Sequence, residues 1–266
     1  MASEACVNVR LKNRVSDEFM SDLEKIYGIH AVEALLRHHP KRVKQLLIAE
    51  GRNEQGVQAI LQLAKNERVA MQQCSRQEID EQAGEVVHQG VMAWVSPSQV
   101  WSEQMLDTLL EQHETPALLL VPDGVTDPHN LGACIRTADA AGVLAVIVPK
   151  DKSATLNATV RKVACGAAEV MPLVSVTNLA RTLEKLRQQG FWVVGTAGEA
   201  EQTLYQQDLT GNKVLVMGAE GKGMRRLTRE HCDFLVKLPM AGSVSSLNVS
   251  VATGVCLFEA QRQRHQ

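Results

Sequence analysis

Several residue types that would mark a particular class of protein are scarce in this chain of 266 residues. The six cysteines form no CxxC pair, so the sequence predicts neither a structural zinc site nor a disulfide framework. We expect free, mostly buried thiols in a reducing cytosol. No apolar run approaches the roughly 20 residues of a membrane-spanning helix, and the charged N-terminus is unlike a secretory signal. These absences predict a cytoplasmic protein with no membrane partner.

Aromatic side chains and net charge are also low. Aromatics make up 3% of the chain, which argues against extensive base stacking, and the formal net charge is −2. The eight histidines show no HExxH spacing, so we expect no metal site. Positive charge is instead gathered locally, which leaves room for a nucleic-acid interface. Three groups stand out: Arg37, Lys41, Arg42 and Lys44; Lys150, Lys152, Arg161 and Lys162; and Lys222, Arg225, Arg226 and Arg229.

The hydrophobic pattern divides the chain into two α/β series. Residues 1–25 are expected to form a polar, poorly ordered leader, residues 26–98 a small α/β domain, residues 99–115 a linker, and residues 116–266 a larger α/β domain. Continuous apolar strands in the larger domain favour a mostly parallel sheet covered on both faces. Ligands of such sheets bind beyond the carboxyl ends of the strands.

The expected elements follow from periodicity and from turn residues. Helices are expected around Val32 and Ile60, over residues 78–83, 101–114, 131–141, 157–166 and 179–189, and after Asn248. Strands are expected over residues 43–49, 69–74, 91–95, 117–121, 145–148, 170–173, 191–196 and 213–217, with a last one opening at Leu238.

Three loops that follow apolar strands carry the polar residues most suited to chemistry. In the first, Asp127-Pro128 sets a turn, Asn130 is placed to cap the next helix, and Arg136 follows on that helix. We expect Asn130 and Arg136 to reach the same pocket. A plain capped turn with a surface arginine is the alternative interpretation.

The second loop, MGAEGKGM, is rich in glycine, which allows a ligand to approach the backbone closely. Its spacing is neither GxGxxG nor GxxxxGK[ST], so dinucleotide and P-loop interpretations fail. The basic residues Lys222, Arg225, Arg226 and Arg229 follow directly, which suits a partner that carries phosphate. A solvated, charged helix is the competing interpretation.

The third loop lies between Leu238 and the closing helix. It holds Ser243, Ser245, Ser246 and Asn248, more small polar groups than a helix cap needs. The helix then presents a stripe of apolar residues at helical spacing, expected to pack either in the core or against a second copy of the chain. The stripe consists of Leu247, Val251, Val255 and Phe258.

Together the three loops resemble the motifs of the SpoU family of RNA ribose 2'-O-methyltransferases, within the SPOUT superfamily. The matched segments are DPHNLGACIRTADAAGV, VMGAEGKGM and LPMAGSVSSLNVSVATGVCLFE, and the resemblance covers about residues 116–264. Two earlier segments, YGIHAVEALL and VHQGVMAWV, resemble the L30e-like RNA-binding domain found in many members. The whole chain is most similar to members that methylate a guanosine of 23S ribosomal RNA in the peptidyl-transferase region.

This resemblance implies a SPOUT catalytic domain with a deep C-terminal trefoil knot, a homodimer, S-adenosyl-L-methionine as methyl donor, and no metal. It places the cofactor against Thr196, Gly198, Gly218, Leu238, Met240 and Leu247. It places Asn130, Arg136, Glu220, Ser246 and Asn248 around the reacting ribose. The backbone of these loops can read an adenine edge, and the leucines and methionine offer apolar contact.

Other functions stay open at this point. One is 2'-O-methylation of transfer RNA, and another is an RNA-binding factor that has the fold but no activity. A third, a nucleotide-dependent α/β enzyme of a different class, is disfavoured because both phosphate-loop fingerprints are missing.

Arg136 generates a first prediction. The family resemblance makes it the activating residue, but a guanidinium keeps its proton in proteins and is a poor base. We therefore expect a clamp on the target's phosphate that also stabilises the developing alkoxide. Arg136→Lys keeps the charge and loses the planar fork, so methylation should fall far more than cofactor affinity. Assays of both quantities test this, and equal losses would contradict it.

Overall fold

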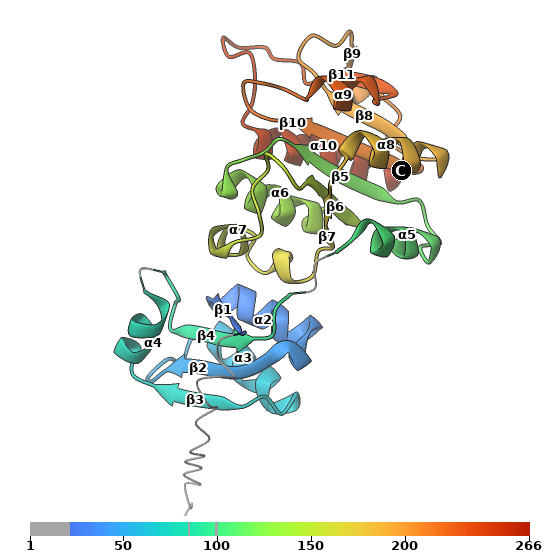
Figure 1. The fold of residues 1–266 in the computed structure, drawn as a ribbon. Helices are drawn as coiled ribbons and strands as arrows, with labels where there is room; N and C mark the ends of the chain where they lie inside the picture. Colours follow the sequence, from blue (N-terminus) through green and yellow to red (C-terminus); the bar gives the residue numbers. More distant parts are fainter. Residues whose placement is uncertain (1–21, 85, 99–100) are drawn as a thin grey trace, which may run out of the picture.

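The computed structural model describes residues 22–84, 86–98 and 101–266, which form two sheets, each with its own helices (Figure 1). Most of the predicted leader, residues 1–21, lies outside the described residues. The elements of the first unit are β1 (Glu24–Tyr27), α2 (Ile29–His38), η1 (Pro40–Arg42), β2 (Val43–Ala49), α3 (Gln55–Asn66), β3 (Met71–Cys74), α4 (Arg76–Ala83) and β4 (Val91–Val95).

The first sheet has the strand order β1-β4-β2-β3, with β4 antiparallel to both neighbours and β3 parallel to β2. Helices α2 and α3 bury Val32, Leu35 and Ile60 against one face, and α4 buries Ile79 against the other. The predicted leader is wrong at its end, because Glu24 and Lys25 pair with Val95 and Trp94. That strand was missed because Ile26 is its one fully buried residue.

The second unit is built on a seven-stranded sheet. Its elements are α5 (Glu103–Glu111), β5 (Leu118–Asp123), α6 (Pro128–Ala140), β6 (Ala145–Pro149), α7 (Ala158–Val163), η2 (Ala167–Glu169), β7 (Leu173–Val176), α8 (Leu179–Gln188), β8 (Trp192–Thr196), β9 (Gln202–Thr203), η3 (Leu204–Gln206), β10 (Lys213–Gly218), α9 (Arg226–Glu230), β11 (Phe234–Lys237) and α10 (Val249–Arg264). The strand order is β7-β6-β5-β10-β8-β11-β9 and the recorded pairings are parallel, which confirms the predicted sheet.

Alternate residues of the central strands face opposite layers of helices, because successive side chains of a strand point to opposite faces. On β5, Leu118 and Leu120 belong to the core shared with α6, α7 and α10. Leu119 and Val121 belong to the core shared with α5 and α8. This burial on both faces explains the unbroken apolar runs in the sequence.

Three predicted boundaries are corrected. Strand β7 begins at Leu173, the last of the residues assigned to it, because the turn η2 and Pro172 occupy the space before it. Strand β11 ends at Lys237, so Leu238 opens a loop whose next residue, Pro239, has no N–H to continue a ladder. The linker assignment is wrong for α5, because its Leu106 is buried in the core of the second unit.

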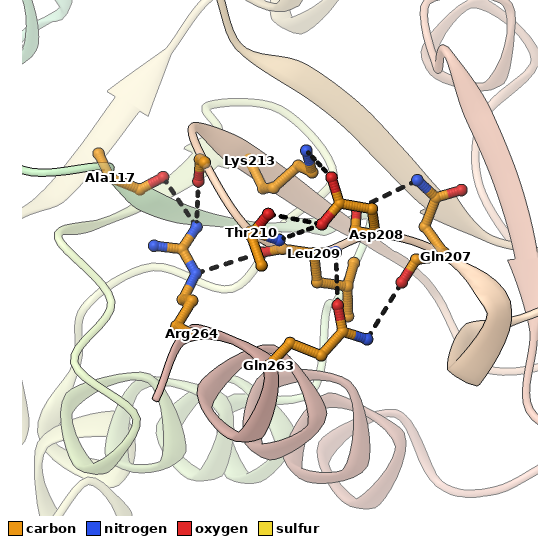
Figure 2. A network of polar contacts seen from close by, with 9 residues as sticks. Ala117, Gln207, Asp208, Leu209, Thr210, Lys213, Gln263 and Arg264 are labelled. Carbon is orange, nitrogen blue, oxygen red and sulfur yellow. Dashed lines mark hydrogen bonds and ion pairs between the residues drawn. The ribbon is translucent and has the colours of Figure 1, made fainter. Parts of the chain in front are cut away.

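The last turn of α10 is anchored by polar contacts at the amino ends of the strands (Figure 2). Arg264 donates from Nη1 to the Pro116 carbonyl at 2.9 Å and from Nε to the Leu209 carbonyl at 3.2 Å. Gln263 accepts from the Leu209 N–H at 2.8 Å and donates to the Gln207 carbonyl at 3.1 Å. Burial lowers the pKa of Arg264, and of nearby Lys213, which keeps an ion pair with Asp208. With this end fixed, the start of α10 is held at the opposite, carboxyl edge of the sheet.

The cysteines of the described residues are free, as predicted. Cys74, Cys134 and Cys256 are buried, whereas Cys165 and Cys232 are half-buried, and Cys6 lies outside the described residues. Burial raises the pKa of Cys134 to about 11 and that of Cys256 to about 12, so both stay protonated thiols. None of the helices in the described ranges has the length and apolar character to cross a bilayer.

Candidate functional site

A cleft of about 460 Å³ lies beyond the carboxyl ends of β8, β10 and β11. Its walls are the loop after β8, the glycine loop after β10, the loop after β11 and the first turns of α10. The structure brings together in this cleft all of the residues predicted to hold a cofactor: Thr196, Gly198, Gly218, Leu238, Met240 and Leu247. The position agrees with the rule that open parallel sheets bind ligands at this edge.

The glycine loop is folded back on the end of its own strand. Ala219 and Gly223 exchange backbone hydrogen bonds of 3.1 and 2.9 Å, which closes the turn. A Cβ on Gly218 would lie 2.5 Å from the backbone of both Gly223 and Met224, closer than real Cβ atoms come. Gly221 has a φ of 74°, in the left-handed region that favours glycine. This side of the cleft is therefore bare backbone, able to approach a ligand closely.

An ion pair with a buried acid fixes this loop to the centre of the sheet. Asp123, the last residue of β5, is fully buried and accepts from the backbone N–H of Arg225 at 2.9 Å and from its Nε at 2.7 Å. The pair was missed at the sequence level, although an acid ending an apolar strand is a signal of a buried polar contact.

The same pair bears on the interpretation of the basic cluster. Arg225 is committed to Asp123, Arg226 pairs with Glu230 at 2.7 Å, and Arg229 pairs with Glu199. Arg225 is thus paired within the chain, and the charges of Arg226 and Arg229 are balanced locally. A phosphate-binding role for this cluster stays a prediction.

The predicted catalytic residues fall into three places. Glu220 and Ser246 line the cleft. Asn248, rather than a serine, caps α10, because its Oδ1 accepts from the Ser250 N–H at 2.9 Å. Its Nδ2 donates to Oδ1 of Asn130 at 3.0 Å, which joins the N-termini of α6 and α10.

This arrangement fixes the amide of Asn130. Asp127 caps α6 by accepting from the His129 N–H at 2.9 Å, so the predicted cap by Asn130 is wrong. Because Oδ1 of Asn130 accepts from Asn248, its Nδ2 is left to donate outward, with no partner recorded among the described residues. Such a donor suits a ribose or phosphate oxygen.

Arg136 stands apart from the cleft. It lies on α6 about 9 Å along the helix axis from Asn130. Its exposed side chain donates from Nη1 to Sγ of Cys165 at 3.3 Å, and it is not among the residues that line the cleft. Asn130 is likewise outside the lining of the cleft, so the prediction that Asn130 and Arg136 reach one pocket stays a prediction.

Two polar groups outside the cleft have structural partners. The His88 side chain is only 3% exposed, with Nε2 2.6 Å from Oδ1 of Asp80 and Nδ1 accepting from the Gly90 N–H. Its neighbour Gln89 accepts from the Ile29 N–H at the start of α2. Arg161 is also buried and belongs to an ionic network.

The cleft suits a nucleoside-bearing sulfonium compound such as S-adenosylmethionine. Leu238, Met240 and Leu247 give apolar contact, and the glycine loop gives backbone donors and acceptors. Within the described ranges, no three His, Cys, Asp or Glu side chains are grouped so that they could hold a metal ion.

Comparison with known proteins gives two family matches. Residues 117–258 match the model of the SpoU rRNA Methylase family. Residues 25–101 match the model described as RNA 2'-O ribose methyltransferase substrate binding.

Individual relatives cover nearly the whole chain. The 23S rRNA (guanosine-2'-O-)-methyltransferase RlmB of Pseudomonas syringae is 76% identical over 92% of this chain and 98% of its own length. The protein of the same description from Escherichia coli is 59% identical, over 91% and 99%. Among solved structures, the SpoU methyltransferase AviRb from Streptomyces viridochromogenes, in complex with the cofactor AdoMet, has a TM-score of 0.73 and 25% identity, over 94% of this chain and 93% of that chain.

The packing at Gly218 generates the second prediction. Gly218→Ala would push the turn at Gly223 away from the strand end, because the added Cβ meets backbone on both sides. We expect calorimetry to show the loss of S-adenosylmethionine binding. Gly242→Ala is the matched control, since Gly242 has open space around it and does not line the cleft. Wild-type affinity in Gly218→Ala would show that the cleft does not depend on this contact.

Proposed function

This chain belongs to the SpoU rRNA methylase family, and we propose that it methylates the ribose 2'-hydroxyl of a guanosine in 23S ribosomal RNA, with S-adenosylmethionine as donor. The observation that carries the proposal is 76% identity to a relative of that description over nearly its whole length. The residues of all three motifs are present in the chain, which favours an active enzyme over a silent RNA-binding factor.

The cofactor supplies a methyl group on a positively charged sulfur. The residues of the cleft then have two tasks. The glycine loop and the apolar side chains Leu238, Met240 and Leu247 hold the donor, and the polar side chains hold the ribose in line with it. The ribose oxygen forms the new bond to the methyl carbon while the carbon–sulfur bond breaks, and the hydroxyl proton leaves to solvent or to a nearby acceptor.

Each polar residue is given a role from its place. Asn130 directs its free Nδ2 toward a ribose or phosphate oxygen, and Asn248 holds Asn130 in that orientation. Ser246 and Glu220, at the cleft wall, orient the hydroxyl and its neighbours. Arg136 clamps the phosphate next to the target ribose and offsets the negative charge that develops on the attacking oxygen.

We further propose that the protein is a homodimer that packs through α10. Val251 and Phe258 are 53% and 54% exposed, so the predicted apolar stripe does not pack in the core at these two positions. The buried face of α10 is instead formed by Val249, Cys256, Leu257 and Ala260. Large apolar side chains exposed on one helix face suit a second copy, and such a copy accounts for the position of Arg136 if it serves the partner's cleft.

The two units divide the work in this proposal. Residues 26–98 bind RNA, and the second unit, which includes α5, transfers the methyl group. The match of residues 25–101 to a substrate-binding model supports the first role. We propose the cytoplasm as the site of action, because a ribosomal RNA substrate is found there. The trefoil knot and the L30e-like nature of the first unit stay predictions.

The substrate generates the third prediction. Ribosomal RNA from cells that lack this protein should miss one 2'-O-methylguanosine in the peptidyl-transferase region of 23S RNA, as read by mapping of 2'-O-methyl sites. Resupply of the wild-type chain should restore it. Purified protein should bind S-adenosylmethionine but neither ATP nor NAD. Loss of a transfer-RNA methyl group with 23S RNA unchanged would contradict the proposal.

The dimer generates the fourth prediction. Phe258→Glu places a charge on the exposed face of α10, and sedimentation velocity should show the mass fall from that of two chains to that of one, 29.1 kDa. Tyr205→Glu is the control, because Tyr205 is equally exposed, at 54%, on another element. A wild-type protein that sediments as a single chain would refute the dimer.

A further inference from the structure

The two units meet at a buried carboxylate. Glu169, in η2 of the second unit, has a side chain that is 1% exposed, and each of its oxygens faces a different arginine. Oε2 lies 3.2 Å from Nη1 of Arg42, which belongs to η1 of the first unit. Oε1 accepts from Nη1 of Arg161, which belongs to α7 of the second unit. One acid therefore bridges two cations from opposite sides of the junction.

The arginines extend the network into the first unit and the connecting segment. Arg161 donates from Nη2 to Oε2 of Glu24, in β1, at 3.0 Å and to Oγ of Ser98 at 2.8 Å. Arg42 donates from Nε to the Ser96 carbonyl at 3.2 Å. The two acids and two arginines balance in charge. Strand β1, η1 and the segment after β4 are thus all tied to α7 and η2.

A steric contact beside the network leaves little freedom. Gly166, with a φ of +95°, lies against α2, and a Cβ there would be 2.8 Å from both Cβ of Ala34 and the His30 carbonyl. The backbone of the second unit therefore touches the first unit directly. The preceding residue, Cys165, contacts Arg136. The domain junction is therefore connected to Arg136, a predicted catalytic residue, through the adjacent residues Gly166 and Cys165.

Buried ion pairs contribute little net stability, since desolvation offsets most of their attraction. They are nevertheless demanding in geometry, because a shift of either unit would leave a buried charge without a partner. An apolar contact of similar size tolerates sliding far better. The network therefore selects one orientation of the first unit relative to the cleft.

We propose that Arg161 and Glu169 are positioning residues for the RNA: with Arg42 and Gly166 they lock the first unit at one angle, so that RNA bound to it delivers its ribose to the methyl donor. They act through the placement of the first unit and of Arg136, without contact to the cofactor. The inference rests on the proposed function, because it assigns RNA binding to the first unit.

Glu169→Gln tests the lock, since it keeps the shape and removes the charge that both arginines share. Small-angle scattering of the full-length variant should show a larger radius of gyration than that of the wild type. We expect kcat/KM on 23S RNA to fall by about 100-fold, as for a reacting group misplaced by 1 Å. The calorimetric affinity for S-adenosylmethionine should be unchanged, and this split is the signature of a positioning role.

Two further variants keep the test decisive if Glu169→Gln folds poorly. Glu24→Gln removes one outer, 39% exposed partner of Arg161 and should give an intermediate loss with the fold intact. Glu184→Gln, the matched control, breaks the exposed ion pair between Glu184 and Arg187 within α8 and should change nothing.

The outcomes separate this inference from the proposed function. If both Glu169→Gln and Glu24→Gln scatter like the wild type, or if the units separate without loss of RNA methylation, the inference is overturned. If the wild type itself does not methylate 23S RNA, the proposed function is wrong, and the role of the first unit in delivering the ribose is wrong as well. The scattering comparison then still decides whether the network locks the two units.

Discussion

The cleft depends on one close backbone contact. Gly218 ends β10 directly against Gly223 and Met224, and no side chain fits between them. That contact turns the loop back over the strand end, and the pairing of Arg225 with buried Asp123 keeps it there. Because β5 and β10 are neighbours at the centre of a sheet buried on both faces, the loop inherits the rigidity of the core. A ligand that forms hydrogen bonds with backbone groups needs those groups held rigidly in place.

The polar side of the site is organised by helix ends. The hydrogen bond between Asn130 and Asn248 joins the N-termini of α6 and α10, which come from distant parts of the chain. Asn248 also caps α10, so one side chain both fixes a helix start and orients a neighbour's amide. At the other end of α10, Arg264 and Gln263 hold the helix to the strand starts. The helix is thereby fixed along its length, and small shifts at either end would reach the cleft.

The junction between the units combines a buried ionic network with the close contact of Gly166 against α2. Each unit has its own cores, and the contacts between them centre on Glu169, Arg161 and Arg42. Such a junction specifies an angle more than it stabilises a fold. This is consistent with two units that must be held in register over a large substrate.

Much of the fold was predictable from the sequence, because it depends on local periodicity. The buried strands 117–121 and 213–217 were recognised from their apolar runs. The first overlaps β5 from Leu118 onward, and the second lies within β10. Strand β1 was not, since one buried residue in Glu24–Tyr27 gives no alternating pattern. The family resemblance assigned the cofactor residues to the loops after β8, β10 and β11, and the structure gathers them in one cleft.

The sequence by itself determined the fold class, the order of the elements and the residue set of the cleft. Only the tertiary structure decided which polar groups are paired with other residues of the chain and which are exposed. It assigned Arg225 to Asp123, buried His88 and Arg161, left Arg136 away from the cleft, and exposed Val251 and Phe258. The reason is physical: periodicity reports which face of an element is apolar, whereas the partner of a charge is set by contacts between residues far apart in the chain. Those contacts exist only once the sheet and its helices have packed.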